Sequence, residues 1–352
     1  MENKAYNVKE TKNSIHVDYE GKLSFKERMI SKIKTANTWI TIGINFLRFV
    51  LMLGVSYVIL YPFFSRIAGS FMTKEDIVDA TVSLIPKHFT LDTYKYIIQD
   101  NHYLEALWNT LTLSLLCALI QTLVACLIGY GLAKFKFKGN KLIMIFVVIS
   151  MIIPHRTLKF AFARFFVNFD LFRIQAWDYK GPIELLFGNS IEMINSPLPL
   201  VVLSICGLAF KNGLYIYLMR QFFKGVPDEL EESAYVDGSG VFRTFFQIIL
   251  PLSVPMMITV FLFSFSWQWT DEFYMSSTMF RSGSSTYYLM ADVYATTPIT
   301  FQPLEMTFPG WRLYKSVIQN TAGMLIIAPL LVLYLFCQKY LVQGIERSGL
   351  VG

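Results

Sequence analysis

The sequence predicts an all-α, polytopic membrane protein with six transmembrane helices, and its composition carries that prediction. Hydrophobic residues make up 54% of the 352 positions. Charged residues make up only 16%, against about 25% in an ordinary soluble domain. A soluble chain with so few charges could not cover its surface, and the same composition excludes intrinsic disorder. The net charge of +6 is spread along the chain and gives no indication of nucleic-acid binding.

Four stretches without charged residues mark helices that are long enough to cross a bilayer. A membrane-spanning helix needs about 20 residues to cover roughly 30 Å of hydrocarbon. The uncharged stretches hold 17, 28, 27 and 23 residues, at positions 49–65, 106–133, 244–270 and 316–338. We expect them to form the first, second, fifth and sixth transmembrane helices.

Two further spans are less regular, and counting them brings the total to six. The third, Leu142–Pro154, holds only 13 residues, so it must continue through Arg156 and Lys159 to cross. The fourth, Pro197–Phe223, is long enough but carries Lys211 near its middle. A lysine inside a span costs about 2.5–3.5 kcal/mol on insertion scales, so it should face a cavity, meet a partner charge or extend toward the interface.

Residues 1–36 are predicted to be a cytoplasmic extension, and residues 37–352 a transmembrane domain. The extension mixes basic and acidic residues and has no early apolar core, so it is not a signal peptide. The segment Ser24–Lys34 is interpreted either as an amphipathic surface helix or as part of a solvated tail.

The distribution of lysine and arginine predicts the orientation of the spans. An even number of spans places both termini on one side of the membrane. The segments that are then cytoplasmic hold 17 basic residues in 93 positions, against 12 in 134 for the outer segments. The positive-inside rule therefore favours cytoplasmic N- and C-termini in a multi-pass membrane protein.

The predicted inner loop, residues 223–251, is expected to form two short helices joined by a turn. Pro227 suits the first position of a helix, and the acidic residues after it complement the positive helix end. Gly238 allows the positive φ that a tight break requires. A second helix follows, and four of its residues are expected on one face at helical spacing: Phe242, Phe245, Phe246 and Ile249. The loop is either a docking element for a partner or a hairpin that only connects two spans.

The spacing within this loop resembles the EAA motif of the permeases of ATP-binding cassette (ABC) importers. That motif reads Glu-Ala-Ala, three residues, Gly, nine residues, Ile, one residue and Leu-Pro. Every interval matches here, at Glu232, Ser233, Ala234, Gly238, Ile248, Leu250 and Pro251. Ser233 in place of alanine is the only departure, and serine is small enough for close packing.

The resemblance extends over roughly residues 43–352 and is to the carbohydrate-importer permeases, in particular to the second permease subunit of maltose-type systems. Trp108-Asn109-Thr110 is similar to the Asn-Ser that opens the family's second span. The end of span five, SWQWTDEFY, is similar to the family's Trp-Asn-Glu-Phe. The outer loop 167–198 fits worst, because it is longer and more polar than the family's connection at this point.

The resemblance implies a type I ABC importer permease that is not an enzyme. The chain has no GxxxxGK[ST] phosphate-binding loop, so ATP and Mg²⁺ would bind on separate ATP-binding subunits. No cofactor is implied for this chain, and no Cys/His cluster with the spacing of metal ligands is present in the sequence. The implied partners are a second homologous permease, two ATP-binding subunits, an extracellular solute-binding lipoprotein and membrane lipid. The implied location is the plasma membrane of a prokaryote.

The resemblance also assigns roles to individual loop residues. Glu232 would pair with a basic group of the ATP-binding subunit, and Gly238 would form the turn. The residues implied in coupling to the ATPase are Glu232, Ser233, Ala234, Asp237, Gly238, Ile248 and Pro251.

The candidates for the substrate path are less specific. They are Trp267, Trp269, Asp271, Lys211 and Asn109. Aromatic rings pack on the apolar faces of sugars, although an aromatic belt at the membrane interface explains the tryptophans equally well. Lys211, with Arg156 and Lys159, would suit an acidic sugar, or would pair with acids of the partner permease.

Carbohydrate import, of an oligosaccharide in particular, is thus the expected function. The alternatives are a secondary, ion-coupled transporter and an ABC permease for a non-sugar or acidic-sugar solute. An ion-coupled transporter favours internal repeats and acidic residues within the spans, and the sequence offers neither clearly.

Overall fold

The structure is a computed structural model that describes residues 7–11, 14–18, 36–170, 181–194, 196–271, 289–291, 293–294 and 310–349. The chain divides into two compact units, Met1–Ser65 and Arg66–Gly352. The helix α2 (Ala36–Gly69) runs across the boundary between them. The predicted boundary between extension and transmembrane domain, at residue 36, stays a prediction.

The first unit contains a small β-hairpin that the sequence reading did not predict. Strand β1 (Asn7–Thr11) pairs antiparallel with β2 (Ser14–Asp18), with Val8 opposite Val17. A two-residue connection and β-branched residues in both strands are typical of a hairpin. The expected helix at Ser24–Lys34 lies outside the described residues.

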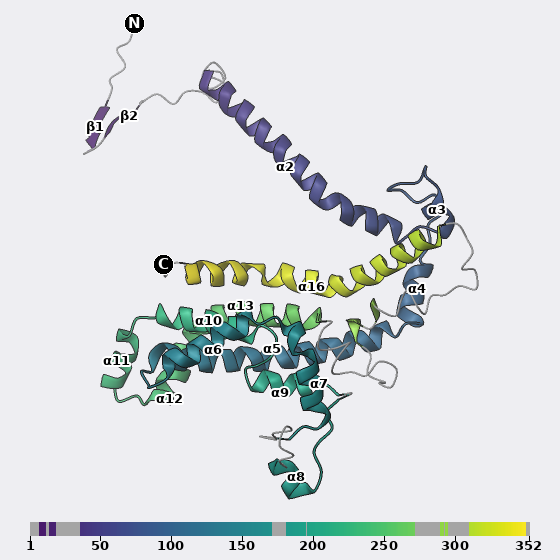
Figure 1. Cartoon of the computed structure of the whole chain (residues 1–352). Coiled ribbons are helices and arrows are strands. Elements are labelled where there is room, and N and C mark those ends of the chain that lie inside the picture. Colours follow the sequence, from purple (N-terminus) through teal and green to yellow (C-terminus); the bar gives the residue numbers. More distant parts are fainter. Residues whose placement is uncertain are drawn as a thin grey trace. The chain divides into compact units, whose positions relative to one another are not determined.

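Four long apolar helices confirm the predicted first, second, fifth and sixth spans. Within the described residues, the helices long and apolar enough to cross a membrane run Trp39–Gly69, Tyr103–Lys134, Val241–Trp269 and Arg312–Tyr340. The second is α5 (Tyr103–Lys134), and the last lies within α16 (Trp311–Gly349). Figure 1 shows α5 and α16 as extended helices of the second unit.

The third and fourth predicted spans are not continuous helices, so the count of six is not established. The third consists of α6 (Asn140–Ile152), a 3₁₀ turn (His155–Leu158) and α7 (Lys159–Val167), with a break at Ile153 and Pro154. Proline restricts the residue before it to extended backbone, and Ile153 has ψ 121°.

The fourth predicted span divides into α9 (Leu198–Ile205) and α10 (Asn212–Lys224). Two residues with left-handed backbone stand between these helices, Gly207 at φ 70° and Lys211 at φ 64°. The sequence predicted Lys211 near the middle of a continuous span, and this prediction is wrong. Lys211 occupies the N-cap position of α10.

The core of the second unit forms where α10 and α13 (Leu250–Trp269) pack on α5. Gly129 of α5 permits the close approach, since a Cβ there would lie 2.7 Å from the Cβ of Met219. A polar tie crosses the same core. The Gln121 amide donates to Ser204 Oγ at 3.0 Å and accepts from Ser264 Oγ at 2.7 Å, which links α5 to α9 and α13.

Short helices extend the second unit at both ends. At the end where α16 begins lie α3 (Lys74–Val78) and α4 (Asp92–Gln99). The segment around residues 167–198 contains α8 (Pro182–Phe187), and the Asp170 carboxylate accepts hydrogen bonds from the Ile183 and Glu184 amides at the start of that helix. The opposite end carries α11 (Glu229–Val236) and α12 (Val241–Thr244) (Figure 1).

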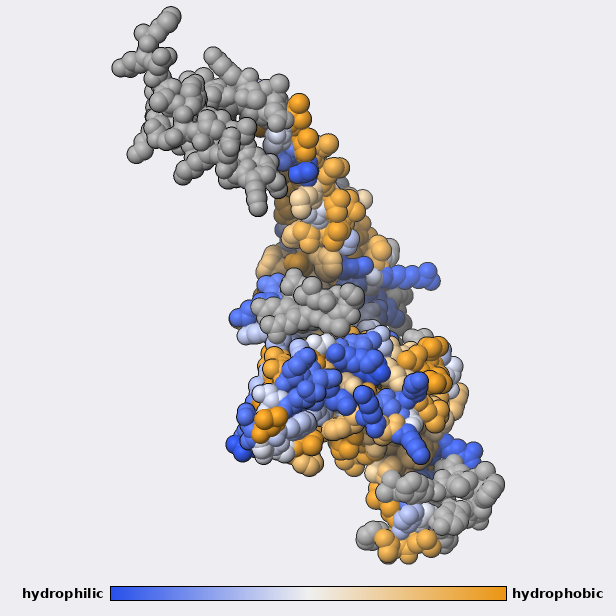
Figure 2. Space-filling model, turned by 90° about the vertical axis from the view of Figure 1, so that its left-hand side faces the viewer, coloured by the Kyte–Doolittle hydropathy of each residue, from blue (hydrophilic) through white to orange (hydrophobic). Residues whose placement is uncertain are grey.

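Hydrophilic side chains gather on the end of the bundle that carries α11 and α12. Figure 2 looks onto this end of the second unit, and hydrophobic side chains follow its flanks. A polar end with apolar flanks is the distribution expected of a helical bundle surrounded by hydrocarbon.

Candidate functional site: the loop between α10 and α13

The first helix of the loop forms as predicted from the acidic residues that follow Pro227. α11 runs from Glu229 to Val236 and follows the N-cap residue Asp228. Glu229, Glu231 and Glu232 occupy its first turn, where their negative charges meet the positive end of the helix dipole.

Burial divides α11 into an inner and an outer face. Glu231 and Ala234, one helical turn apart, are buried, at 8% and 5% exposed. Glu232, Ser233 and Asp237 are exposed. Of the motif residues, Ala234 therefore packs against the protein, while Glu232 and Ser233 are accessible to another molecule.

The turn after α11 depends on a left-handed glycine. Gly238 has φ 81°, and its amide donates to Tyr235 O at 3.0 Å. The next amide, of Ser239, donates to Ala234 O at 2.9 Å, which satisfies a carbonyl at the helix end. A Cβ on Gly238 would meet no atom within 4 Å, so the backbone angle, not space, favours glycine.

The second helix of the loop differs from the prediction, because it is continuous with the span that follows. α12 passes through a π-helical turn, Phe245–Ile249, directly into α13. Pro251 lies in the first turn of α13 and Ile248 is half-buried in the π-helical turn. The expected single apolar face is wrong. Phe245 and Ile249 are buried, at 5% and 0% exposed, whereas Phe242 and Phe246 are 81% and 57% exposed.

The division of the phenylalanines has a physical cause. Phe242 and Phe246 are four residues apart, and so are Phe245 and Ile249, which gives two stripes on the helix surface. The inner stripe packs in the core, and the outer stripe leaves two large aromatic rings exposed. Val236, the last residue of α11, is also 87% exposed. Exposed apolar groups next to polar ones are typical of a protein-interaction surface.

A buried lysine ties the loop to α5. Lys134, the last residue of α5, has only 6% of its side chain exposed. Its ammonium donates to Val226 O at 2.7 Å and to the Asp228 carboxylate at 2.5 Å. The hydrogen bond from Lys134 lowers the pKa of Asp228 below its usual value. The sequence alone does not predict this role of Lys134, because a lysine at the end of a span is ordinarily expected to be exposed.

An aromatic cluster reinforces the same connection. The Tyr130 ring on α5 lies 4.7 Å from the ring of Phe245 and 5.4 Å from that of Phe223, measured between centroids. Phe223 lies in the last turn of α10, and Phe245 begins the π-helical turn. The loop is thus held at both of its ends against α5.

The substrate-path candidates are brought together only in part. Trp267 is 45% exposed and its ring lies 5.1 Å from Lys211 Nζ. Trp269 is buried, and its indole donates to Ile326 O at 2.9 Å. This hydrogen bond links α13 to α16. Asn109 and Asp271 are half-buried.

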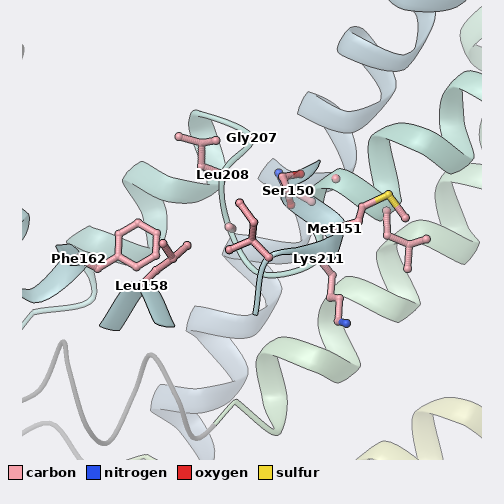
Figure 3. A pocket seen from close by; sticks show the side chains of 12 residues that line it. Ser150, Met151, Leu158, Phe162, Gly207, Leu208 and Lys211 are labelled. Carbon is pink, nitrogen blue, oxygen red and sulfur yellow. The ribbon is translucent and has the colours of Figure 1, made fainter. Parts of the chain in front are cut away.

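A cavity lies beside the break between α9 and α10. It has a volume of about 210 Å³ and is lined largely by apolar side chains from α6, the 3₁₀ turn, α7 and residues 207–209 and 211–214. Figure 3 shows Phe162 and Leu158 on one side and Ser150 and Met151 on another. The side chain of Lys211 extends away from Phe162 and Leu158. The side chains of Arg156 and Lys159 lie outside the described part of the structure.

The long apolar helices define the class of integral membrane proteins that cross the bilayer several times. Residues 121–347 match the family described as binding-protein-dependent transport system inner membrane component. The match covers more than half of the chain, and the chain belongs to this family. It is therefore a permease subunit of an ABC transporter in a bacterial plasma membrane, without a catalytic role.

The chain is similar to several known permeases over nearly the whole length of each. The chain is 29% identical over 308 residues to the galactooligosaccharides transport system permease protein GanQ of Bacillus subtilis, covering 86% of this chain and 94% of the relative. It is 28% identical over 305 residues to the maltodextrin transport system permease protein MalD of Streptococcus pneumoniae, with the same coverage of 86% and 94%. It is 24% identical over 294 residues to the polygalacturonan/rhamnogalacturonan transport system permease protein YtcP of Bacillus subtilis, covering 83% and 92%.

A solved structure supports the fold. The chain resembles one from the crystal structure of a bacterial ABC transporter involved in the import of the acidic polysaccharide alginate. The TM-score is 0.63 at 17% identity, and the likeness covers 90% of this chain and 98% of the other. At this identity the likeness shows the fold alone.

Proposed function

We propose that this chain is the permease subunit of an ATP-driven importer for an oligosaccharide, and that it forms half of the translocation path. The relatives are named for transport of galactooligosaccharides, maltodextrin and polygalacturonan or rhamnogalacturonan. Their shared substrate class is a chain of sugars, with both neutral and acidic members. Family membership counts against the alternative of a self-sufficient ion-coupled transporter.

The observation that carries the proposal is the anchored loop between α10 and α13. We infer that its exposed residues dock into a cleft on a separate ATP-binding subunit. Glu232 and Ser233 would face that subunit from α11, and Phe242 and Phe246 would add apolar contact. Ala234 would hold α11 against the bundle.

The anchors supply the mechanical part of this function. Transport coupled to ATP requires that movement of the ATPase reaches the membrane helices through a rigid element. The Lys134–Asp228 ion pair and the Tyr130–Phe245 ring contact would make α5 move with the docked loop, and the Tyr130–Phe223 ring contact would include α10. Import would follow as the helices alternate between inward-open and outward-open states.

The proposed complex contains a second, homologous permease, two ATP-binding subunits and an extracellular solute-binding lipoprotein. ATP and Mg²⁺ would bind to the ATP-binding subunits. The proposed orientation has both termini in the cytoplasm, which places α11 and α12 on the ATPase side.

Replacing Gly238 tests the docking role. In Gly238→Asp we expect the complex to assemble while ATP hydrolysis is uncoupled from uptake, since the change adds charge at the docking turn. Aspartate tolerates left-handed backbone better than most residues, so the fold should survive. The measurement is sugar uptake per ATP hydrolysed in proteoliposomes that contain the whole complex.

Gly238→Asn is the matched control, because asparagine has nearly the same shape and backbone tolerance without the charge. We expect it to keep more of the coupling than the aspartate variant. Uptake at the unaltered rate in Gly238→Asp would contradict the docking assignment.

A further inference from the structure

A cation stands at the break between α9 and α10. Lys211 precedes α10, a helix of 13 residues that leads to the loop between α10 and α13, which we call the coupling loop. At 1.5 Å per residue, Lys211 lies about 20 Å from the loop end of α10, which is well within roughly 30 Å of hydrocarbon. The lysine also adopts the left-handed backbone, with φ 64°, that non-glycine residues seldom occupy. Strained backbone of this kind clusters at functional sites.

Two aromatic rings, and no carboxylate, surround the ammonium among the described residues. Lys211 Nζ lies 5.1 Å from the ring centroid of Phe210 and 5.1 Å from that of Trp267. The two rings are 5.4 Å apart, at 68° to each other. The ion pairs of the described residues do not include Lys211. Cation–π contacts stabilise an ammonium, and they leave its hydrogen-bond donors available.

The surroundings of the break favour a negative charge. The N-terminus of α10 carries a partial positive charge that adds to that of Lys211. Asn212, the next residue, is 1% exposed, and neither amide atom of its side chain makes a hydrogen bond with the described residues. Trp267 remains 45% exposed, so part of its ring is open for a sugar face to stack on.

A purely structural role explains these observations less well. A lysine that only extended toward the interface would place its ammonium in water, not against two rings within the span. A side chain that only packed α10 against α13 would need no charge, since leucine could fill the same contact. It would also need no break in the helix. An ammonium at this depth that has no counter-ion among the described residues is expected to bind an anion reversibly.

We propose that Phe210, Lys211 and Trp267 form a binding station for the carboxylate of an acidic sugar, a uronate unit of the transported oligosaccharide. The ammonium would bind the carboxylate, and the exposed part of the Trp267 ring would stack on the apolar face of the sugar. This inference rests on the proposed function and narrows its substrate class.

A pair of ligands that share the same sugar chain and differ in the charge of the carboxyl groups, with one added methyl group per unit in the ester, tests the station. The whole complex, in nanodiscs and without its binding protein, is titrated with tri-galacturonate and with the fully methyl-esterified trimer, and binding is followed by saturation-transfer NMR. We expect the acid to bind about tenfold more tightly than the ester, the difference typical of one charge-assisted hydrogen bond.

Substitutions then assign that difference to Lys211. In Lys211→Gln we expect the ratio of the two dissociation constants to fall to about one, and in Lys211→Arg, which keeps the charge, we expect it to persist. Trp267→Ala should weaken both ligands alike while leaving the ratio in place. A purely structural lysine would instead lower both affinities together.

Two results would overturn the station. One is an unchanged ratio in Lys211→Gln. The other is a ratio near one for the unaltered complex, which needs no variant and so does not depend on any variant folding. If that complex still hydrolyses ATP in response to its sugar-loaded binding protein, the station fails and the proposed function stands.

Discussion

Lys134 illustrates how one side chain can determine the position of a whole loop. Three lysines that follow it in the chain, Lys136, Lys138 and Lys141, are exposed. Lys134 instead turns inward and donates to Val226 O and Asp228. Its charge is buried but paired, which is the condition under which a buried ammonium is tolerated.

Removing this ammonium should loosen the loop. Lys134→Met keeps the length of the apolar stem but leaves Val226 O without its donor, which costs about 1–3 kcal/mol for a buried acceptor. We expect faster amide hydrogen exchange across residues 226–236 and a lower coupling ratio in the assembled complex. Lys136→Met is the control. Lys136 is exposed, and its substitution removes the same charge two residues further along the chain. Equal exchange in the two variants would show that the Lys134 contacts do not hold the loop.

The pH dependence of the same contact follows from the lowered pKa of Asp228. Because the folded pKa lies below the unfolded value of about 3.9, the ion pair stabilises the loop above that pH and is lost as the pH falls through the folded pKa. We expect the unaltered protein to exceed Asp228→Asn in thermal stability at neutral pH, with the gap closing below about pH 4. Melting curves of both proteins between pH 7 and pH 3 measure it. A gap that widens on acidification would have the wrong sign for this pair.

At the scale of the elements, the sequence predicts length better than continuity. Uncharged stretches located four spans correctly, because the length of a hydrophobic stretch can be counted directly in the sequence. The breaks at Pro154 and at Gly207 and Lys211 depend on backbone angles, which hydropathy does not report. Pro227, the acidic residues after it and Gly238 likewise predicted the α11 helix and its turn, whereas the split of Phe242 from Phe245 depends on what each side of the helix packs against.

Close helix packing is a second property that the sequence conceals. Gly129 and Gly131 look equivalent in the chain, yet a Cβ on Gly129 would lie 2.7 Å from Met219 Cβ and 2.9 Å from Arg220 N, while one on Gly131 would meet nothing within 4 Å. The Arg220 amide belongs to the backbone of α10 and cannot turn aside. Only the fold therefore distinguishes a glycine that the packing requires from one that it does not.

This difference gives a matched pair of substitutions. We expect Gly129→Ala to destabilise the protein by about 1–3 kcal/mol, the usual cost of overpacking, because α10 must move away from α5. Gly131→Ala should be neutral or stabilising by about 0.5–1 kcal/mol, since alanine favours the helix over glycine. Thermal unfolding in one detergent compares the two. Equal melting temperatures would show that α5 and α10 are not in close contact at Gly129.

For the whole molecule, orientation in the membrane decides which end can meet an ATPase. The proposal requires α11 and α12 to face the cytoplasm together with the lysine loop after α5. The segment with α3 and α4 must then face outward. Basic residues concentrate in the segments predicted to be cytoplasmic, and the positive-inside rule turns that asymmetry into a direction.

Cysteine labelling in intact cells tests this direction. Single cysteines replace exposed residues at each end, Lys87→Cys on the α3–α4 side and Lys136→Cys or Val236→Cys on the coupling side. With a membrane-impermeant maleimide we expect Lys87→Cys to react in intact cells and the other two to react only after permeabilisation. The unaltered protein, whose four cysteines lie in apolar segments, supplies the background. Labelling of Val236→Cys in intact cells would place the coupling loop outside, where no ATP-binding subunit could reach it, and the docking role of Glu232 and Gly238 would fail with it.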